Sequence, residues 1–133
     1  MLKNLNFKKN DILWLFYIPL LYNSKKNIFL AKKLIERDKI NSICSFVNIK
    51  THPYNVWKIH GSNVNKIIKN DVYRRQDLPK FYEHHHHVCA FKVNIFKKLN
   101  SELIYNKTLP FIINKNEEKK FIEIDNKEDL KKL

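Results

Sequence analysis

Two apolar runs separated by an amphipathic segment constrain the fold of this chain most. "DILWLFYI" (11–18) and "SICSFVNI" (42–49) are apolar at successive positions, which predicts two strands buried on both faces. The segment between them predicts a helix with Ser24 as its N-cap. Its apolar stripe consists of Ile28, Ala31, Leu34 and Ile35. A strand, a helix and a strand at this spacing predict a βαβ unit in a parallel sheet, and therefore an α/β fold.

The rest of the chain supplies further elements to the same domain. "VWKIH" and "NVNKII" flank His60-Gly61-Ser62, which predicts a β-hairpin. "HVCAFKV" (87–93) returns to the sheet, and "NIFKKLNSEL" predicts a short helix. "TLPFII" and "KFIEI" are further strand candidates, and "NKEDLKKL" is a helix capped by Asp125 or Asn126. A chain of 133 residues is then one α/β domain with a sheet extension in its middle.

The charge of the chain has two interpretations. The formal net charge is +13, from 26 basic and 13 acidic residues, and it attracts phosphates, nucleic acid or acidic ligands. Only three of the basic residues are arginine, however, and the abundance of Lys, Asn and Ile is typical of an A- and T-rich gene. The alternative is therefore a basic surface without a nucleic-acid partner.

No apolar run reaches the roughly 18 residues of a membrane span, and no signal-peptide pattern follows Met1. Cys44 and Cys89 lie far apart in apolar surroundings, which favours reduced core thiols and a cytoplasmic protein.

Gly61 is the only glycine. Loops that cradle phosphates need glycines, because backbone N–H groups must approach the anion closely. A nucleoside triphosphate would therefore need a cradle from another segment or another chain.

Four consecutive histidines stand out in "YRRQDLPKFYEHHHHVCAF" (73–91). On a regular strand His85, His87 and Cys89 would share one face, and His84 and His86 the other. Three such ligands could hold zinc, but they stretch along a single strand without a second ligand pair. A polar lining of histidines is the other interpretation.

Two more groups of residues are candidate binding sites. In "RRQDLP", Arg74 and Arg75 could clamp a carboxylate or a phosphate, or form a solvated turn with an ion pair to Asp77. In "FIEIDNKEDL", Glu123 and Asp125 lie on the same strand face, where paired oxygens attract Mg²⁺. The alternative is that Asp125 only caps the following helix.

"THPYNVWKI", "YRRQDLPKFYEHHHHVCAF", "TLPFI" and "IEIDNKEDLKKL", in that order, resemble the acylneuraminate cytidylyltransferase family. The similarity extends from about Asp11 to the end, and its most specific parts are RxQDLP and the acidic terminus. The resemblance implies a nucleotide-diphosphosugar transferase fold of the Rossmann-like, three-layer kind with a mixed sheet. It also implies an extension around 52–90 through which two subunits pair.

Family members transfer CMP from CTP to a sialic acid-type, nine-carbon nonulosonic sugar for surface-glycan biosynthesis, releasing pyrophosphate with the help of Mg²⁺. By resemblance, Arg75 grips the carboxylate of the sugar and Gln76 belongs to the surrounding turn. His85 and His86 replace a substrate-binding Asn-Gly pair, and Glu123 and Asp125 hold the metal ion.

The chain departs from the family pattern in ways that affect function. The amino-terminal strand and the R-x-G-S-K-type loop that binds the CTP phosphates have no counterpart, and Asn55 replaces a basic residue after HPY. We therefore expect the carboxyl-terminal part of a synthetase, inactive alone, that forms a homodimer or joins a complementing amino-terminal fragment. The alternatives are a basic module that binds nucleic acid or an acidic surface, and a non-catalytic dimerisation partner.

Overall fold

The computed structural model describes residues 6–22 and 24–132, and the chain divides into two compact units. The first, called the sheet unit, combines Met1–Val47 with His84–Leu133. The second, called the hairpin unit, is the intervening Asn48–Glu83. The sequence predicts one domain with an extension around 52–90, and the hairpin unit covers most of that range.

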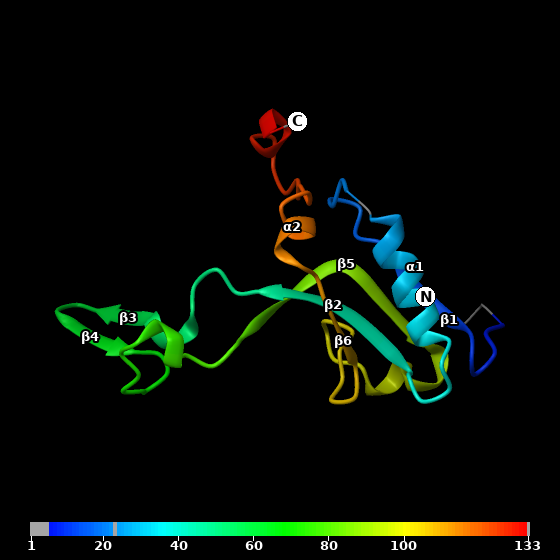
Figure 1. Ribbon diagram of the computed structural model, residues 1–133, viewed down its shortest axis with the longest axis horizontal. Coiled ribbons are helices and arrows are strands. Elements are labelled where there is room, and N and C mark those ends of the chain that lie inside the picture. The colour runs from blue at the N-terminus through cyan, green and yellow to red at the C-terminus, as the bar shows by residue number, and fades with distance from the viewer. Residues whose placement is uncertain (1–5, 23, 133) are drawn as a thin grey trace. The chain divides into compact units, whose positions relative to one another are not determined.

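Four strands form the sheet, in the order β1, β5, β2, β6 (Figure 1). They are β1 (Ile12–Leu15), β2 (Ser42–Asn48), β5 (Tyr82–Lys92) and β6 (Leu109–Ile112). β5 pairs antiparallel with β1, and β2 pairs parallel with β6. β5 is also antiparallel to β2, since Lys92 N donates to Asn41 O while Val88 N donates to Ser45 Oγ. The α/β class is confirmed, and so is the mixed sheet that the family resemblance implies, whereas the parallel sheet expected from the strand–helix–strand pattern is not found.

Helix α1 (Lys25–Ile35) connects β1 to β2 and forms as its sequence predicts. Ser24 is its N-cap, and the Ser24 Oγ accepts a hydrogen bond from Asn27 N at 3.3 Å. The apolar stripe of the helix packs on the sheet, and the core consists of Ala31, Ile35, Ile43, Val88 and Ala90. β5 lies between β1 and β2, so the predicted strand–helix–strand unit connects strands that are not neighbours.

The prediction that residues 11–18 form a fully buried strand is wrong. β1 covers only four residues at one edge of the sheet, and among the described strands it pairs with β5 alone. Its side chains are half-buried or exposed, and Ile18, just beyond it, is 91% exposed. An apolar run therefore predicts that a strand forms, but it does not predict whether that strand is buried. Burial depends on the segments from elsewhere in the chain that pack against the strand.

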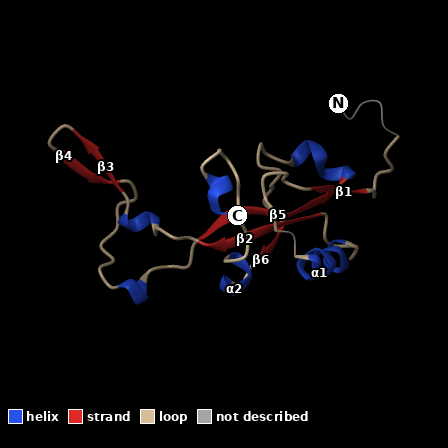
Figure 2. Cartoon of the chain, turned by 90° about the horizontal axis from the view of Figure 1, so that it is seen from above, coloured by secondary structure: helices blue, strands red, loops and turns tan. Residues whose placement is uncertain are grey.

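The carboxyl-terminal part differs most from the sequence prediction. A short helix, α2 (Lys115–Glu118), begins after Asn114, whose side chain accepts hydrogen bonds from Asn116 N and Glu117 N. Figure 2 shows α1 and α2 on the same side of the sheet. The strand expected at "KFIEI" is reduced to a single β-bridge between Leu20 and Glu123.

Two of the predicted helices are 3₁₀ turns instead of longer helices, namely Val93–Lys98 and Asp129–Lys132. Asn126, not Asp125, caps the second, since the Asn126 Oδ1 accepts from Glu128 N and Asp129 N.

The hairpin unit contains the predicted β-hairpin. Strands β3 (Trp57–His60) and β4 (Asn63–Lys66) pair antiparallel, and Gly61 turns between them with φ of +58°. That angle favours glycine because it has no Cβ. None of the residues 48–83, all of which the structure describes, is buried. The hairpin unit is therefore held together by hydrogen bonds and ring contacts between exposed or half-buried residues rather than by a hydrophobic core.

Within the described ranges, we find no helix with the length and apolar character needed to cross a membrane.

Candidate functional site

A cavity of about 600 Å³ lies within the hairpin unit, and Arg75 lines it. We call it the Arg75 cavity. Its walls are residues 48–52, 55, 75 and 78–81. They therefore come from the end of β2, from the "THPYN" segment and from the "RRQDLPKF" segment. Its volume falls within the range of small-molecule sites in proteins.

The charged side chains among the described lining residues of this cavity are all positive. Lys50, Arg75 and Lys80 line it, and none of the lining residues that the structure describes is Asp or Glu. Asn48, Thr51 and Asn55 add neutral side chains that can donate or accept hydrogen bonds. Such a lining attracts an anion that also carries hydroxyl groups, since the cations bind the charge and the amides bind the hydroxyls.

Arg74 and Arg75 differ in their position relative to the cavity. Arg75 begins a short 3₁₀ turn, Arg75–Asp77, and lines the cavity, whereas Arg74 is the residue that precedes the turn and does not line it. The ion pairs formed by described residues include neither arginine, so the ion pair with Asp77, which was one of the two interpretations of this segment, is not found. The Arg75 guanidinium is therefore available to an anionic ligand.

His52 connects the two segments that form the cavity. Its Nε2 lies 3.0 Å from the carbonyl oxygen of Pro79, and its Nδ1 lies 3.2 Å from Tyr54 N. Because a carbonyl only accepts, Nε2 carries the proton and Nδ1 accepts the hydrogen bond from Tyr54 N. The His52 ring also packs against the rings of Tyr54 and Phe81, at 5.0 Å from each. His52 thus fixes the position of the wall that carries Arg75.

Sequence reasoning identified Arg75 but missed Lys50, Lys80 and His52. All three residues lie in or next to motifs that the sequence analysis singled out. Lys50 precedes "THPYN", His52 is its second residue, and Lys80 follows the proline of "RRQDLP". Lysine is abundant throughout the chain, so neither Lys50 nor Lys80 is distinctive in the sequence. Only the folded hairpin unit brings these groups to one cavity.

The other predicted substrate-binding residues do not line the Arg75 cavity. Gln76 belongs to the same 3₁₀ turn as Arg75, and its side chain is exposed. His85 and His86 belong to the sheet unit, on opposite faces of β5. The His85 ring lies 4.7 Å from Phe121, and the His86 ring lies 4.7 Å from Tyr17.

A second, smaller cavity of about 160 Å³ lies in the sheet unit, and we call it the histidine cavity. Its lining includes His84, His86 and Cys89 from β5, and Glu102 and Leu103 from the loop before β6. His84 Nδ1 lies 3.9 Å from Glu102 Oε2.

The fold lowers the pKa of two histidines of the run, which favours their neutral form. Burial is the main cause that lowers the pKa of His84, and His86 lowers it further, although Glu102 raises it. Burial also lowers the pKa of His87, against the raising effect of the Glu117 carboxylate. Neither ring nitrogen of the buried His87 has a hydrogen-bond partner among the described residues.

The prediction that His85, His87 and Cys89 share one face is wrong for Cys89, which lines the cavity with His84 and His86. The alternation along β5 therefore shifts by one residue before Cys89. Ser45 on β2 lies at this shift, where its Oγ accepts from Val88 N at 2.9 Å and donates to His85 O at 2.5 Å. In the described part of the chain no three His, Cys, Asp or Glu side chains come together as a metal site.

The predicted metal ligands Glu123 and Asp125 lie in an extended segment of the sheet unit. Leu21 N donates to Ile122 O and Ile124 N donates to Pro19 O, both at 3.0 Å, which pairs this segment with residues 19–21. Glu123 and Asp125 are exposed, whereas Ile122 and Ile124 are half-buried. This alternation directs both carboxylates to solvent. Two such groups fit Mg²⁺, which takes one or two carboxylates and completes its shell with phosphates and water.

The aromatic residues are more exposed than their apolar surroundings suggest. Phe91 is the only aromatic side chain in the described ranges that is buried, whereas Trp57 is 49% and Tyr73 98% exposed. Many of the other aromatic residues are exposed because they lie near the edge strand β1 or in the hairpin unit, which has no core.

Comparison with known proteins leaves the family open. A scan of protein-family models finds none that matches this chain, and a search of curated proteins finds no matching relative.

Proposed function

We propose that this chain is a cytidylyltransferase-like protein whose Arg75 cavity binds the carboxylate of an acidic nonulosonic sugar. The observation that carries the proposal is that Arg75, from "RRQDLP", lines a cavity whose described lining residues include three cations and no carboxylate. The mixed sheet and the separate hairpin unit agree with the mixed sheet and extension of the family that the sequence resembles.

Each kind of side chain in the cavity can interact with a different part of the sugar acid. The Arg75 guanidinium can form two parallel hydrogen bonds with a carboxylate, which lysine cannot. Lys50 and Lys80 raise the positive potential around the anion. Asn48, Thr51 and Asn55 can bind sugar hydroxyls. A nine-carbon sugar acid combines one carboxylate with several hydroxyls, which this lining matches.

The reaction that we propose joins this sugar to CMP. The anomeric hydroxyl of the sugar attacks the α-phosphorus of CTP, and the bond to the leaving pyrophosphate breaks. Glu123 and Asp125 would hold Mg²⁺, which neutralises phosphate charge when bound. The chain has one glycine and no glycine-rich phosphate loop, so we expect no turnover from it alone.

A partner could supply the triphosphate site. The partner that we propose is a second copy of the chain or a complementing amino-terminal fragment. Two exposed apolar surfaces favour such association. The first is the edge strand β1 with the residues that follow it, and the second is the hairpin face with Trp57, Ile59 and Val64.

The test measures binding of N-acetylneuraminic acid by isothermal titration calorimetry. Arg75→Ala should weaken binding about tenfold or more, because hydrogen bonds to charged groups contribute about 1.5–3 kcal/mol. Arg74→Ala is the matched control, since it removes the same charge from the neighbouring position and should change affinity less than twofold. The methyl ester of the sugar, which lacks the negative charge, should bind the unsubstituted protein as weakly as the free acid binds Arg75→Ala.

Equal effects of Arg74→Ala and Arg75→Ala would show that total charge, not the cavity, binds the acid, and would overturn the proposal. Release of pyrophosphate from CTP, Mg²⁺ and the sugar by this chain alone would contradict the expected lack of turnover.

A basic nucleic-acid-binding module is the second candidate, and the exposed aromatics favour it. Trp57 and Tyr73 are exposed on the hairpin unit, and Lys66 Nζ lies 5.5 Å from the Trp57 ring centre. Aromatic rings beside lysines bind single strands by stacking and charge. Binding to generic single-stranded DNA that falls steeply with salt, weakens in Trp57→Ala and is unchanged in Arg75→Ala would favour this function.

A further inference from the structure

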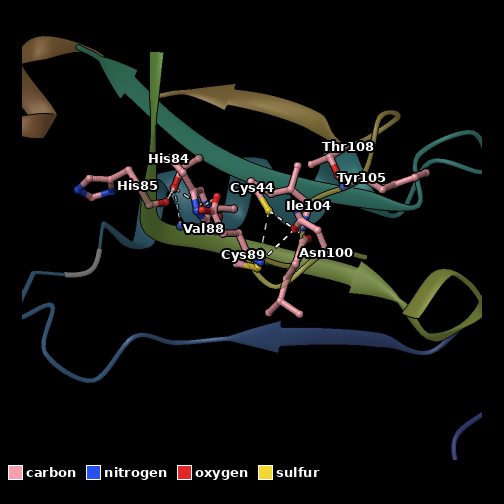
Figure 3. Close-up of polar contacts among 12 residues, drawn as sticks. Cys44, His84, His85, Val88, Cys89, Asn100, Ile104, Tyr105 and Thr108 are labelled. Carbon is pink, nitrogen blue, oxygen red and sulfur yellow. Dashed lines mark hydrogen bonds and ion pairs between the residues drawn. The ribbon is translucent and has the colours of Figure 1, made fainter. Parts of the chain in front are cut away.

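The two cysteines of the chain form a close pair inside the sheet unit. Cys44 on β2 and Cys89 on β5 lie with their sulfur atoms 3.7 Å apart (Figure 3). Both thiols are free, Cys44 is fully buried, and Cys89 is 6% exposed. Their distance along the sequence, 45 residues, gives no indication of this pairing.

The backbone at this pair is compatible with a disulfide. Lys92 N donates to Asn41 O at 2.8 Å, and β2 and β5 are antiparallel, so Cys44 stands opposite Cys89. Opposite residues on antiparallel strands have Cα atoms about 4.5–5.5 Å apart, within the range of about 4.4–6.8 Å found in disulfides. The sulfurs need to approach from 3.7 Å to about 2.05 Å, which side-chain rotation can achieve.

The two thiols differ in their access to solvent. Cys89 lines the histidine cavity, and Cys44 does not. The cavity is open at its rim, because Leu15, Tyr17 and His86 are exposed there. A small solute that enters the cavity therefore meets Cys89 first, with Cys44 directly behind it.

The two thiols also differ in chemistry. The Cys44 thiol donates a hydrogen bond to Cys89, which lowers the pKa of Cys89 and, together with burial, raises the pKa of Cys44. The negative charge therefore forms on the sulfur that lines the cavity. The thiolate is the nucleophilic form of cysteine, so the more reactive of the two thiols is also the one that lines the cavity.

We propose that Cys89 is a peroxide-reactive thiol and that Cys44 is its resolving partner. The Cys89 thiolate attacks one oxygen of hydrogen peroxide, the O–O bond breaks, and Cys89 becomes a sulfenic acid as hydroxide leaves. Cys44 then loses its proton, and its sulfur attacks the Cys89 sulfur. The S–O bond breaks and the S–S bond forms. In sum, two thiols are oxidised to one disulfide and one peroxide is reduced to two waters.

The disulfide would join the two strands between which the hairpin unit is inserted. Residues 48–83 lie within the loop that Cys44 and Cys89 would close. Closing a loop restricts the unfolded chain. The oxidised protein should therefore unfold at a higher denaturant concentration than the reduced protein.

The test exposes the full chain to about one equivalent of hydrogen peroxide, blocks remaining thiols and identifies tryptic peptides by mass spectrometry. Trypsin separates the cysteines, since Cys44 falls in peptide 40–50 and Cys89 in peptide 81–92. The expected product is these two peptides joined, with the loss of two hydrogens. Two free, blocked peptides, or joined peptides from different chains, would overturn the proposal.

Two near-isosteric variants assign the roles. In Cys44→Ser the peroxide should add oxygen to peptide 81–92, because Cys89 reacts but cannot be resolved. In Cys89→Ser peptide 40–50 should stay unmodified at the same exposure. In denaturant the two single-cysteine variants should react at similar rates, which serves as the control for the effect of the fold. Equal rates in the folded variants, or faster reaction of Cys44, would contradict the assignment.

Discussion

The sheet unit and the hairpin unit are organised by different forces. The sheet unit has a core in which Ala31 and Ile35 of α1 and Ile43 of β2 are fully buried. The hairpin unit has no buried residue, and the ring of His52 and the amide of Asn70 connect its segments. Burial of apolar surface is the main favourable term in folding, so the sheet unit should provide most of the stability of the chain.

The absence of a core in the hairpin unit explains why the candidate site lies there. Polar and charged side chains are costly in a core, whereas a unit without a core can direct them into an open cavity. A unit held by a few polar contacts should also open locally at low free-energy cost. A bound ligand would then stabilise the hairpin unit more than the sheet unit, because ligand binding adds stability only where it favours the folded form.

The largest expected effect separates the two units by stability. Ile43→Ala should lower the free energy of unfolding by about 2–5 kcal/mol, because it leaves a cavity in the core. Ile59→Ala is the matched control in the hairpin unit, where the side chain is 71% exposed, and should change it by about 0.5 kcal/mol or less. Denaturant titration followed by circular dichroism measures both. Similar effects of the two substitutions would contradict the contrast between the units.

A smaller effect is expected from breaking the contact between Pro79 and His52. His52→Ala removes the hydrogen bonds to Pro79 O and from Tyr54 N, each worth about 1 kcal/mol. Amide exchange should accelerate in residues 48–83 and stay unchanged in the sheet unit, and affinity for an acidic sugar should fall several-fold. His52→Asn can still accept from Tyr54 N but cannot reach Pro79, so it separates the two contacts. Acceleration in the sheet unit would show that the two units are not independent.

The smallest expected effect is a pH dependence confined to the sheet unit. The folded state lowers the pKa of His84 and of His87 from the usual value of about 6.5. The unfolded chain therefore binds protons at a higher pH than the folded chain, and stability should fall as the pH drops below about 6.5.

Thermal unfolding between about pH 7.5 and 5.5 measures this loss of stability. His87→Leu should reduce the loss, since leucine does not titrate. An unfolding midpoint that rises on acidification would contradict the lowered pKa values.

Local signals in the sequence predicted local structure well. Ser24 and the apolar stripe gave α1, and Gly61 between polar neighbours gave the hairpin turn, because each depends on residues nearby in the chain. The helix α2 was missed although Asn114, followed three residues later by Glu117, is a typical helix start. The run "KFIEI" alternates like a strand, but only a short pairing with residues 19–21 forms there.

Features that depend on distant segments could not be predicted in the same way. The exposure of β1 depends on its place at the edge of the sheet, and the shift along β5 depends on Ser45 of another strand. For the same reason Arg75 could be selected as a rare arginine in a motif, whereas its neighbours in the cavity could not. Lys50 and Lys80 are separated by 29 residues and meet only in the folded hairpin unit.

The most direct test of the account maps the binding of an acidic sugar onto the amide NMR spectrum of the protein. N-acetylneuraminic acid should shift the amide signals of residues 48–52 and 75–81, and leave those of β6 and of residues 42–47 of β2 unchanged. In Arg75→Ala these shifts should disappear at the same sugar concentration, and in Arg74→Ala they should remain. Shifts that are absent from residues 48–52 and 75–81, or that persist in Arg75→Ala, would contradict a carboxylate site at Arg75.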